Sequence, residues 1–124
     1  MCGIVGLFLK DKNLEPELGA LTAEMLVKMS DRGPDSAGLA LYSRDKKFNR
    51  KITLKLVCSK ERKLLYEALN EKKKSDYRIE TRANHITIFF SSSKYQLIMN
   101  IINSLAIQFQ VMSEGEQIEI FKEA

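Results

Sequence analysis

The spacing of apolar residues in the second half of the chain constrains the fold more than any other feature. Apolar residues alternate with more polar neighbours in four runs, which is the period of a half-buried strand. Two further segments carry apolar residues three and four positions apart, which is the period of a helix with one buried face. The strand runs are Ile52–Cys58, Tyr77–Thr81, Ile86–Phe90 and Ile107–Val111, and the helical runs are Leu64–Leu69 and Leu97–Leu105. The predicted order is therefore βαββαβ.

Short polar connections support the same order. Ala83-Asn84 separates two strand runs, which predicts a hairpin in which Asn84 tolerates positive φ. Ser59 and residues 91–93, all serine, precede the two helical runs and are expected to cap them. The βαββαβ order is the ferredoxin-like pattern, which serves binding, regulation and plain scaffolding, so it says little about function by itself.

The first fifty residues predict a different, unfinished lobe. A buried strand is expected at residues 3–9, and an amphipathic helix is expected to begin near Pro16 and to end before Arg32-Gly33-Pro34. A second buried strand is expected at residues 37–42, with a third around Phe48. The helix would cover one face of a sheet, but nothing in this lobe covers the other face. The expected class is α+β, with two lobes that meet near residue 50.

Composition and charge exclude several classes of protein. With 44% hydrophobic and 29% charged residues, the 124-residue chain is expected to be globular, and 20 basic and 16 acidic residues are interspersed along it. We therefore expect no nucleic-acid binding surface. The two cysteines do not form a secreted disulfide framework, and no apolar stretch approaches a membrane span or signal peptide. These features predict a cytoplasmic protein that does not bind membranes.

No metal or other cofactor is expected from the sequence. His85 is the single histidine, and an isolated histidine in a strand is more often a structural residue than a metal ligand. No glycine-rich phosphate loop follows a strand, since Gly3 and Gly6 lie inside the first apolar run.

Cys2 is the candidate catalytic residue. Met1 is expected to be removed before a residue as small as cysteine, which would leave Cys2 with a thiol and a free α-amino group. A cysteine thiol ordinarily titrates at about pH 8.5 and an α-amino group at about 7.7 to 8. The amine can therefore accept the thiol proton as the sulfur attacks a carbonyl.

The opening of the chain resembles that of the class II glutamine amidotransferases, which are N-terminal-nucleophile hydrolases. The similar segments are Met1-Cys2-Gly3-Ile4-Val5-Gly6 and Asp31-Arg32-Gly33-Pro34-Asp35-Ser36-Ala37-Gly38, separated by one helix. The resemblance implies that Cys2 is the nucleophile. It also implies that Arg32, Gly33, Pro34 and Asp35 form a loop that packs beside the active site as support. From the residues alone, a charged turn ended by Pro34 would explain the shape of this loop without any chemistry.

The end of the chain is similar to one branch of this family. Residues 111–123 resemble separate amidotransferase subunits associated with glutamate-synthase-like proteins. The resemblance implies the four-layer αββα sandwich of N-terminal-nucleophile hydrolases, present here in part. Residues 1–50 would be the N-terminal part of the amidotransferase domain, residues 51–112 an inserted ferredoxin-like βαββαβ lobe, and residues 113–124 the return toward the rest of the domain.

The resemblance also implies a substrate, a partner and an incomplete site. Glutamine would form a thioester at Cys2, glutamate would leave after hydrolysis, and ammonia would pass to a synthase partner. The family binds the glutamine carboxylate with an Arg in a His-Thr-Arg-like strand, forms its oxyanion hole with Asn-Gly, and holds the substrate amine with a later Asp. This sequence has no Asn-Gly, and no matching Arg stands beside His85. We expect a fragment with little activity alone.

Two other functions are open from the residues. The βαββαβ lobe could bind a small molecule, or RNA stacked on Phe89 or Phe90, although the basic and aromatic signature of RNA-recognition folds is missing. An unfinished sheet edge would instead serve an interaction protein, which predicts self-association if the fragment is all that exists.

Overall fold

The computed structural model describes residues 2–70 and 76–123, which form an α+β protein. The chain divides into two compact units: residues 2–37 together with residue 123, and the described part of residues 38–122. Met1, whose removal is expected, and residue 124 of the last predicted segment lie outside the described residues. The division into an amidotransferase lobe and an inserted lobe stays a prediction.

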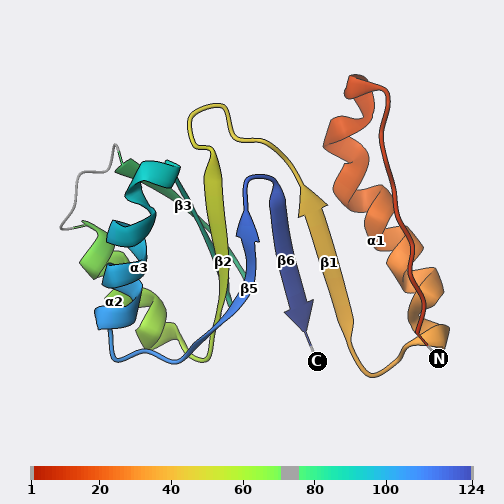
Figure 1. Ribbon diagram of the computed structural model, residues 1–124. Helices are drawn as coiled ribbons and strands as arrows, with labels where there is room; N and C mark the ends of the chain where they lie inside the picture. The colour runs from red at the N-terminus through yellow and green to blue at the C-terminus, as the bar shows by residue number, and fades with distance from the viewer. Residues whose placement is uncertain (1, 71–75, 124) are drawn as a thin grey trace. The chain divides into compact units, whose positions relative to one another are not determined.

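The first unit consists of an extended segment and one helix. Residues 2–11 have no regular secondary structure and run beside the α-helix α1 (Leu18–Met29), which lies between the 3-10 turns η1 (Lys12–Glu17) and η2 (Ser30–Arg32) (Figure 1). The predicted helix is confirmed, and Pro16 lies in η1 just before it. No residue of α1 is buried, so its predicted place over a sheet stays a prediction.

The prediction of a buried strand at residues 3–9 is wrong. A strand is completed by hydrogen bonds to a neighbouring strand. Among the described residues, neither sheet includes this segment. Ile4 and Phe8 are 95% and 85% exposed, so the apolar run is not buried either.

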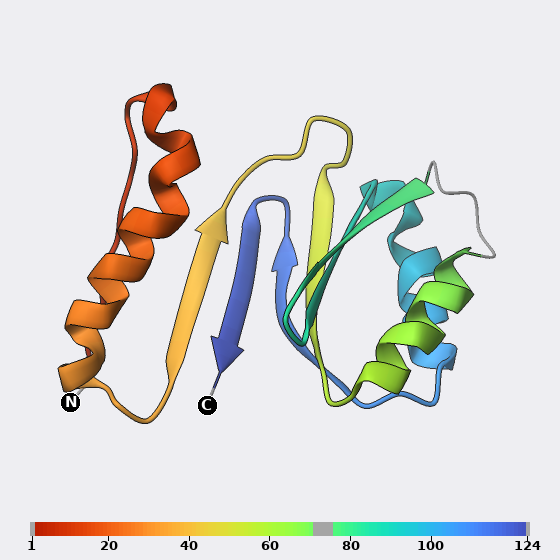
Figure 2. The ribbon, with the colours of Figure 1, turned by 180° about the vertical axis from the view of Figure 1, so that it is seen from behind.

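The second unit contains the predicted βαββαβ order. Its elements are β2 (Arg50–Leu56), α2 (Ser59–Asn70), β3 (Tyr77–Arg82), β4 (His85–Phe90), η4 with α3 (Ser92–Lys94 and Tyr95–Ser104) and β5 (Phe109–Gly115). The four strands form one antiparallel sheet in the order β3-β4-β2-β5. Helices α2 and α3 lie together on one face of this sheet in both views (Figures 1 and 2).

The core lies between this sheet and its two helices. Alternate residues of a strand point to the same face, so the apolar members of each run meet the helices. Fully buried members are Ile52, Leu54, Ile86, Ile88 and Phe90 from the sheet, and Leu65, Leu69, Ile98 and Ile102 from the helices. The predicted alternation is confirmed, and it fixes the register of β2 against β4, because slipping by one residue would move the whole apolar set of a strand to the opposite face of the sheet.

A second, two-stranded sheet accompanies the first. It pairs β1 (Ala37–Tyr42) with β6 (Ile118–Glu123), and the two strands run antiparallel (Figure 1). The strand predicted at residues 37–42 is confirmed, but its predicted burial is wrong because the strand is exposed except at the half-buried Leu41.

The strand predicted around Phe48 is also wrong. Phe48 is buried, but it lies in the loop before β2, which begins at Arg50. The Asp45 carboxylate accepts hydrogen bonds from the backbone N–H groups of Lys47 (2.8 Å) and Phe48 (2.9 Å). These donors serve a side-chain turn and are not available to a strand ladder.

Local turn chemistry differs from the prediction in two places. The predicted hairpin forms, but positive φ falls on Ala83 (51°) and not on Asn84, which is the sign pattern of a type II′ turn. The turn before α3 is capped by the Asn49 side chain, whose oxygen accepts from the Ser92 backbone N–H at 2.8 Å. Ser91 makes no side-chain cap hydrogen bond.

No helix among the described residues is both long and apolar enough to span a membrane.

Candidate functional site

The structure brings Gly3 against the end of α1. A Cβ atom placed on Gly3 would lie 2.3 Å from Cε of Met29 and 3.5 Å from Cβ of Arg32. Only a residue without a side chain allows this approach while Met29 keeps its position. The segment that carries Cys2 therefore passes directly beside the start of the Arg32–Asp35 loop.

The predicted support loop leaves α1 through a tight turn. The 3-10 turn η2 ends at Arg32, and the backbone N–H of Gly33 donates to the Ser30 carbonyl at 3.2 Å. Gly33 is half-buried, whereas Arg32, Pro34 and Asp35 are exposed. Arg32 is the loop residue found next to Gly3, and the other three lead on toward β1. Their role as support for catalysis stays a prediction.

Cys2 and Cys58 are both exposed free thiols. Cys58 lies between β2 and α2, and its backbone N–H donates to the Glu61 carboxylate at 3.0 Å. Exposure therefore does not distinguish the two cysteines. The expected chemical difference is the α-amino group that removal of Met1 would give to Cys2.

His85 has a structural environment. Its side chain is buried in β4, its Nε2 accepts from the Lys122 backbone N–H at 3.2 Å, and its ring meets that of Phe121 edge to face at 5.4 Å. Among the described residues, no group of three or more His, Cys, Asp or Glu side chains could hold a metal ion.

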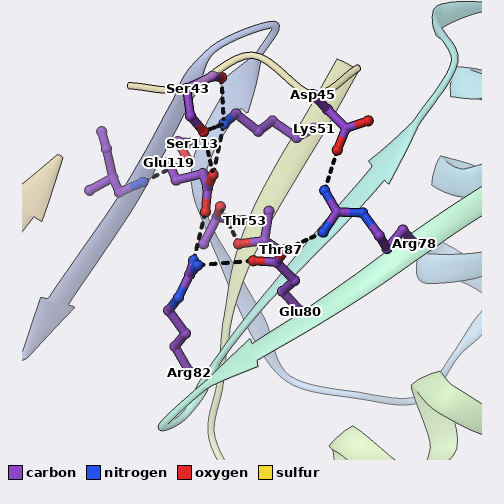
Figure 3. A network of polar contacts seen from close by, with 11 residues as sticks. Ser43, Asp45, Lys51, Thr53, Arg78, Glu80, Arg82, Thr87, Ser113 and Glu119 are labelled. Atoms are coloured by element: carbon purple, nitrogen blue, oxygen red, sulfur yellow. Dashed lines mark hydrogen bonds and ion pairs between the residues drawn. The ribbon is translucent and has the colours of Figure 1, made fainter. Parts of the chain in front are cut away.

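A buried ion pair in the second unit was missed by the sequence analysis (Figure 3). Lys51 of β2 and Glu119 of β6 are 1% and 2% exposed, and Lys51 Nζ donates to Glu119 Oε1 at 2.7 Å. Lys51 Nζ also donates to the carbonyl and hydroxyl oxygens of Ser43, at 3.0 and 3.1 Å. Arg82 of β3 donates to Glu119 Oε2 at 2.9 Å. These partners compensate two charges that burial would otherwise make costly.

The network extends along the same sheet face. Arg82 also pairs with Glu80 at 2.9 Å, and Arg78 pairs with both Glu80 and Asp45. Burial raises the pKa of Asp45, but hydrogen bonds from the Phe48 and Lys47 backbone and from Arg78 outweigh that effect and lower the pKa. The charged chain thus links the loop before β2 to strands β2, β3 and β6.

The alternation of polar and apolar residues in β2 indicated part of this network. Lys51 and Thr53 alternate with Ile52 and Leu54, so they occupy the sheet face away from the helices. In the structure the hydroxyls of Thr53 and Thr87 lie 3.0 Å apart and are buried. The alternation marks a polar face, but it does not show that β6 covers that face.

Comparison with known proteins links the chain to one relative. It is 34% identical over 129 aligned positions to Glutamine amidotransferase-like protein GlxB of Rhizobium meliloti (strain 1021). The alignment covers 99% of this chain and 41% of that protein, so the chain spans about two fifths of the relative's length. No protein-family profile and no solved structure matches the chain. The alignment supports a relationship to glutamine amidotransferases.

Proposed function

We propose that the chain is the N-terminal portion of a class II glutamine amidotransferase domain, with Cys2 as its nucleophile. The observation that carries this proposal is the alignment of nearly the whole chain with a glutamine amidotransferase-like protein. The Cys2-Gly3 start and the loop of Arg32, Gly33, Pro34 and Asp35 support the class. The close approach of Gly3 to Arg32 is consistent with a supporting role for that loop.

The proposed reaction uses the two functional groups of a processed Cys2. The thiol attacks the side-chain carboxamide carbon of glutamine, and the α-amine accepts the thiol proton. The tetrahedral intermediate collapses as that proton passes to the leaving nitrogen, which releases ammonia and leaves a γ-glutamyl thioester. Water then attacks the thioester, glutamate departs, and the thiol is restored. The ammonia would be used by a partner synthase subunit.

The substrate clamp would come from outside this chain. The Arg, Asn-Gly and Asp groups that the family uses have no counterparts in the sequence. Loss of a single oxyanion-hole donor typically lowers the rate by about 10² to 10³. We therefore propose that the chain alone turns over glutamine slowly, and that the rest of the αββα sandwich completes the site.

The βαββαβ segment fits the proposed insertion. Its strand order β3-β4-β2-β5 and its antiparallel pairs are those expected of a ferredoxin-like lobe. Phe89 and Phe90 are 3% and 0% exposed, so neither ring is free to stack on RNA bases. No observation therefore favours the RNA-binding alternative.

Intact mass and glutamine turnover test the proposal together. The chain is made in a reducing cytosol, and its N-terminus is examined by mass spectrometry and by reaction with an aldehyde that forms a thiazolidine only with an N-terminal cysteine. We expect Met1 to be absent and ammonia release to be slow. Cys2→Ser should abolish that release, whereas Cys58→Ser, at the other exposed thiol, should not. A mature protein that retains Met1 would remove the proposed mechanism.

A further inference from the structure

A basic cleft lies in the second unit, whereas the proposed nucleophile belongs to the first. Its volume is about 570 Å³, and the loop before β2 lines it together with the start of β3. Among the described residues, its charged lining consists of the basic residues Arg44, Lys46, Lys47 and Arg78 and of the acidic residue Asp45. The buried rings of Phe48 and Tyr77 also line it.

The loop that carries Arg44, Lys46 and Lys47 is held at its start and in its middle. At its start, the Ser43 carbonyl accepts from the buried Lys51 ammonium at 3.0 Å. In its middle, the Asp45 carboxylate accepts from the backbone N–H groups of Lys47 and Phe48. The same carboxylate pairs with Arg78 (Figure 3). An anchored loop loses little conformational entropy when it binds a ligand.

The cleft keeps a surplus of positive charge after these contacts. Arg78 and Asp45 neutralise each other, and Arg78 has Glu80 as a second partner. Lys46 and Lys47 remain exposed at the rim. With its amide oxygen turned toward Arg44, Gln117 would accept from Arg44 Nε at 3.1 Å and from Nη2 at 3.0 Å and so orient this third cation.

We propose that this cleft binds the phosphate group of a small phosphorylated metabolite. A phosphate dianion offers several acceptor oxygens, and Arg44, Lys46 and Lys47 offer donors from one fixed loop. Arg44, Lys46 and Lys47 lie in one loop and not along a helix or strand, which favours a compact anion over a nucleic-acid backbone. The inference does not depend on the reaction at Cys2.

Titration with inorganic phosphate tests the site. Amide chemical shifts of the complete chain are followed by NMR at constant ionic strength, with potassium chloride as the balancing salt. We expect saturating shifts at residues 44–48 and at Arg78. The Lys46→Gln/Lys47→Gln double variant should weaken binding about tenfold through the loss of two charged donors. The backbone hydrogen bonds to Asp45 do not involve these side chains, so the loop should stay folded.

A matched variant separates a site from general charge attraction. Lys60→Gln/Lys63→Gln removes the same charge from the exposed surface of α2, and it should leave phosphate binding unchanged. Equal weakening in both double variants, or shifts no larger than those produced by chloride, would overturn the proposal. So would an RNA oligonucleotide that saturates the same residues at lower concentration than phosphate does.

Discussion

Gly3 and Gly6 of the N-terminal segment differ in how much space surrounds them. A Cβ at Gly3 would lie 2.3 Å from Met29 Cε, whereas a Cβ at Gly6 would meet nothing within 4 Å. We predict that Gly3→Ala destabilises the first unit by about 1 kcal/mol, because the flexible Met29 end can move only at a packing cost. Hydrogen exchange of the α1 amides measures the effect. Gly6→Ala is the matched control and should not accelerate exchange; equal exchange in the two variants would contradict the predicted contact.

At this scale the sequence predicted the site residues but not their surroundings. Cys2 and the loop from Arg32 to Asp35 were proposed from their residue types, their order and a family resemblance, and their roles stay predictions. The approach of Gly3 to Met29 and Arg32 depends on how the segment lies along α1, and no local pattern encodes that path.

Glu61 joins two elements of the second unit. Its carboxylate accepts backbone hydrogen bonds from Gln108 (2.8 Å), before β5, and from Cys58 (3.0 Å) and Val57 (2.9 Å), before α2. These donors, Gln108 first and then Cys58, lower the pKa of Glu61 despite the opposing effect of burial. A lowered pKa in the folded state means that the ionised carboxylate stabilises the fold.

The lowered pKa of Glu61 determines how the stability of the fold depends on pH. The contribution of Glu61 should be complete above the ordinary glutamate pKa of 4.5 and should disappear as the pH falls through the lower folded-state value. Urea unfolding at a series of pH values, for the native chain and for Glu61→Gln, measures it. We predict a difference in unfolding free energy that is constant near neutrality and shrinks below pH 4.5. A difference that grows toward acid would contradict the assignment.

Elements whose apolar residues recur at a strand or helix period were predicted well, and strands that require another strand to pair with were not. The strand and helix runs between Ile52 and Val111 were found because one face of each is buried in the same core. Residues 3–9 have the same apolar content but no strand partner among the described residues, and propensity alone does not form a strand. Phe48 is buried in a loop because Asp45 organises a turn there.

On the scale of the whole second unit, Lys51 and Glu119 link the two sheets. We predict that Lys51→Met lowers the unfolding free energy by about 3 kcal/mol, because it leaves Glu119 buried with Arg82 as its remaining charged partner. Urea unfolding measures the loss. The Lys51→Met/Glu119→Leu double variant should lose less than the sum of the two single variants, since it leaves neither charge buried alone. A loss below about 1 kcal/mol, the scale of surface ion pairs, would contradict this role.

The pairing of β1 with β6 could not be predicted from local sequence. These strands are far apart in the sequence, and β1 carries no strong alternation to show which face it buries. Long-range pairing of this kind depends on contacts that no short window of sequence contains. For the same reason the polar face of β2 was predicted, while the ion pair that β6 completes was not.

The rate of labelling at Cys2 relative to Cys58 tests the central claim most directly. Both thiols are exposed, so accessibility alone predicts similar rates with a glutamine-analogue electrophile. An N-terminal Cys2 activated by its own α-amine should instead react several-fold faster near neutral pH, and peptide mapping by mass spectrometry would place the adduct. Preferential labelling of Cys2 in a chain that lacks Met1 is the predicted result. Equal labelling of Cys2 and Cys58, or an unprocessed Met1, would contradict the account.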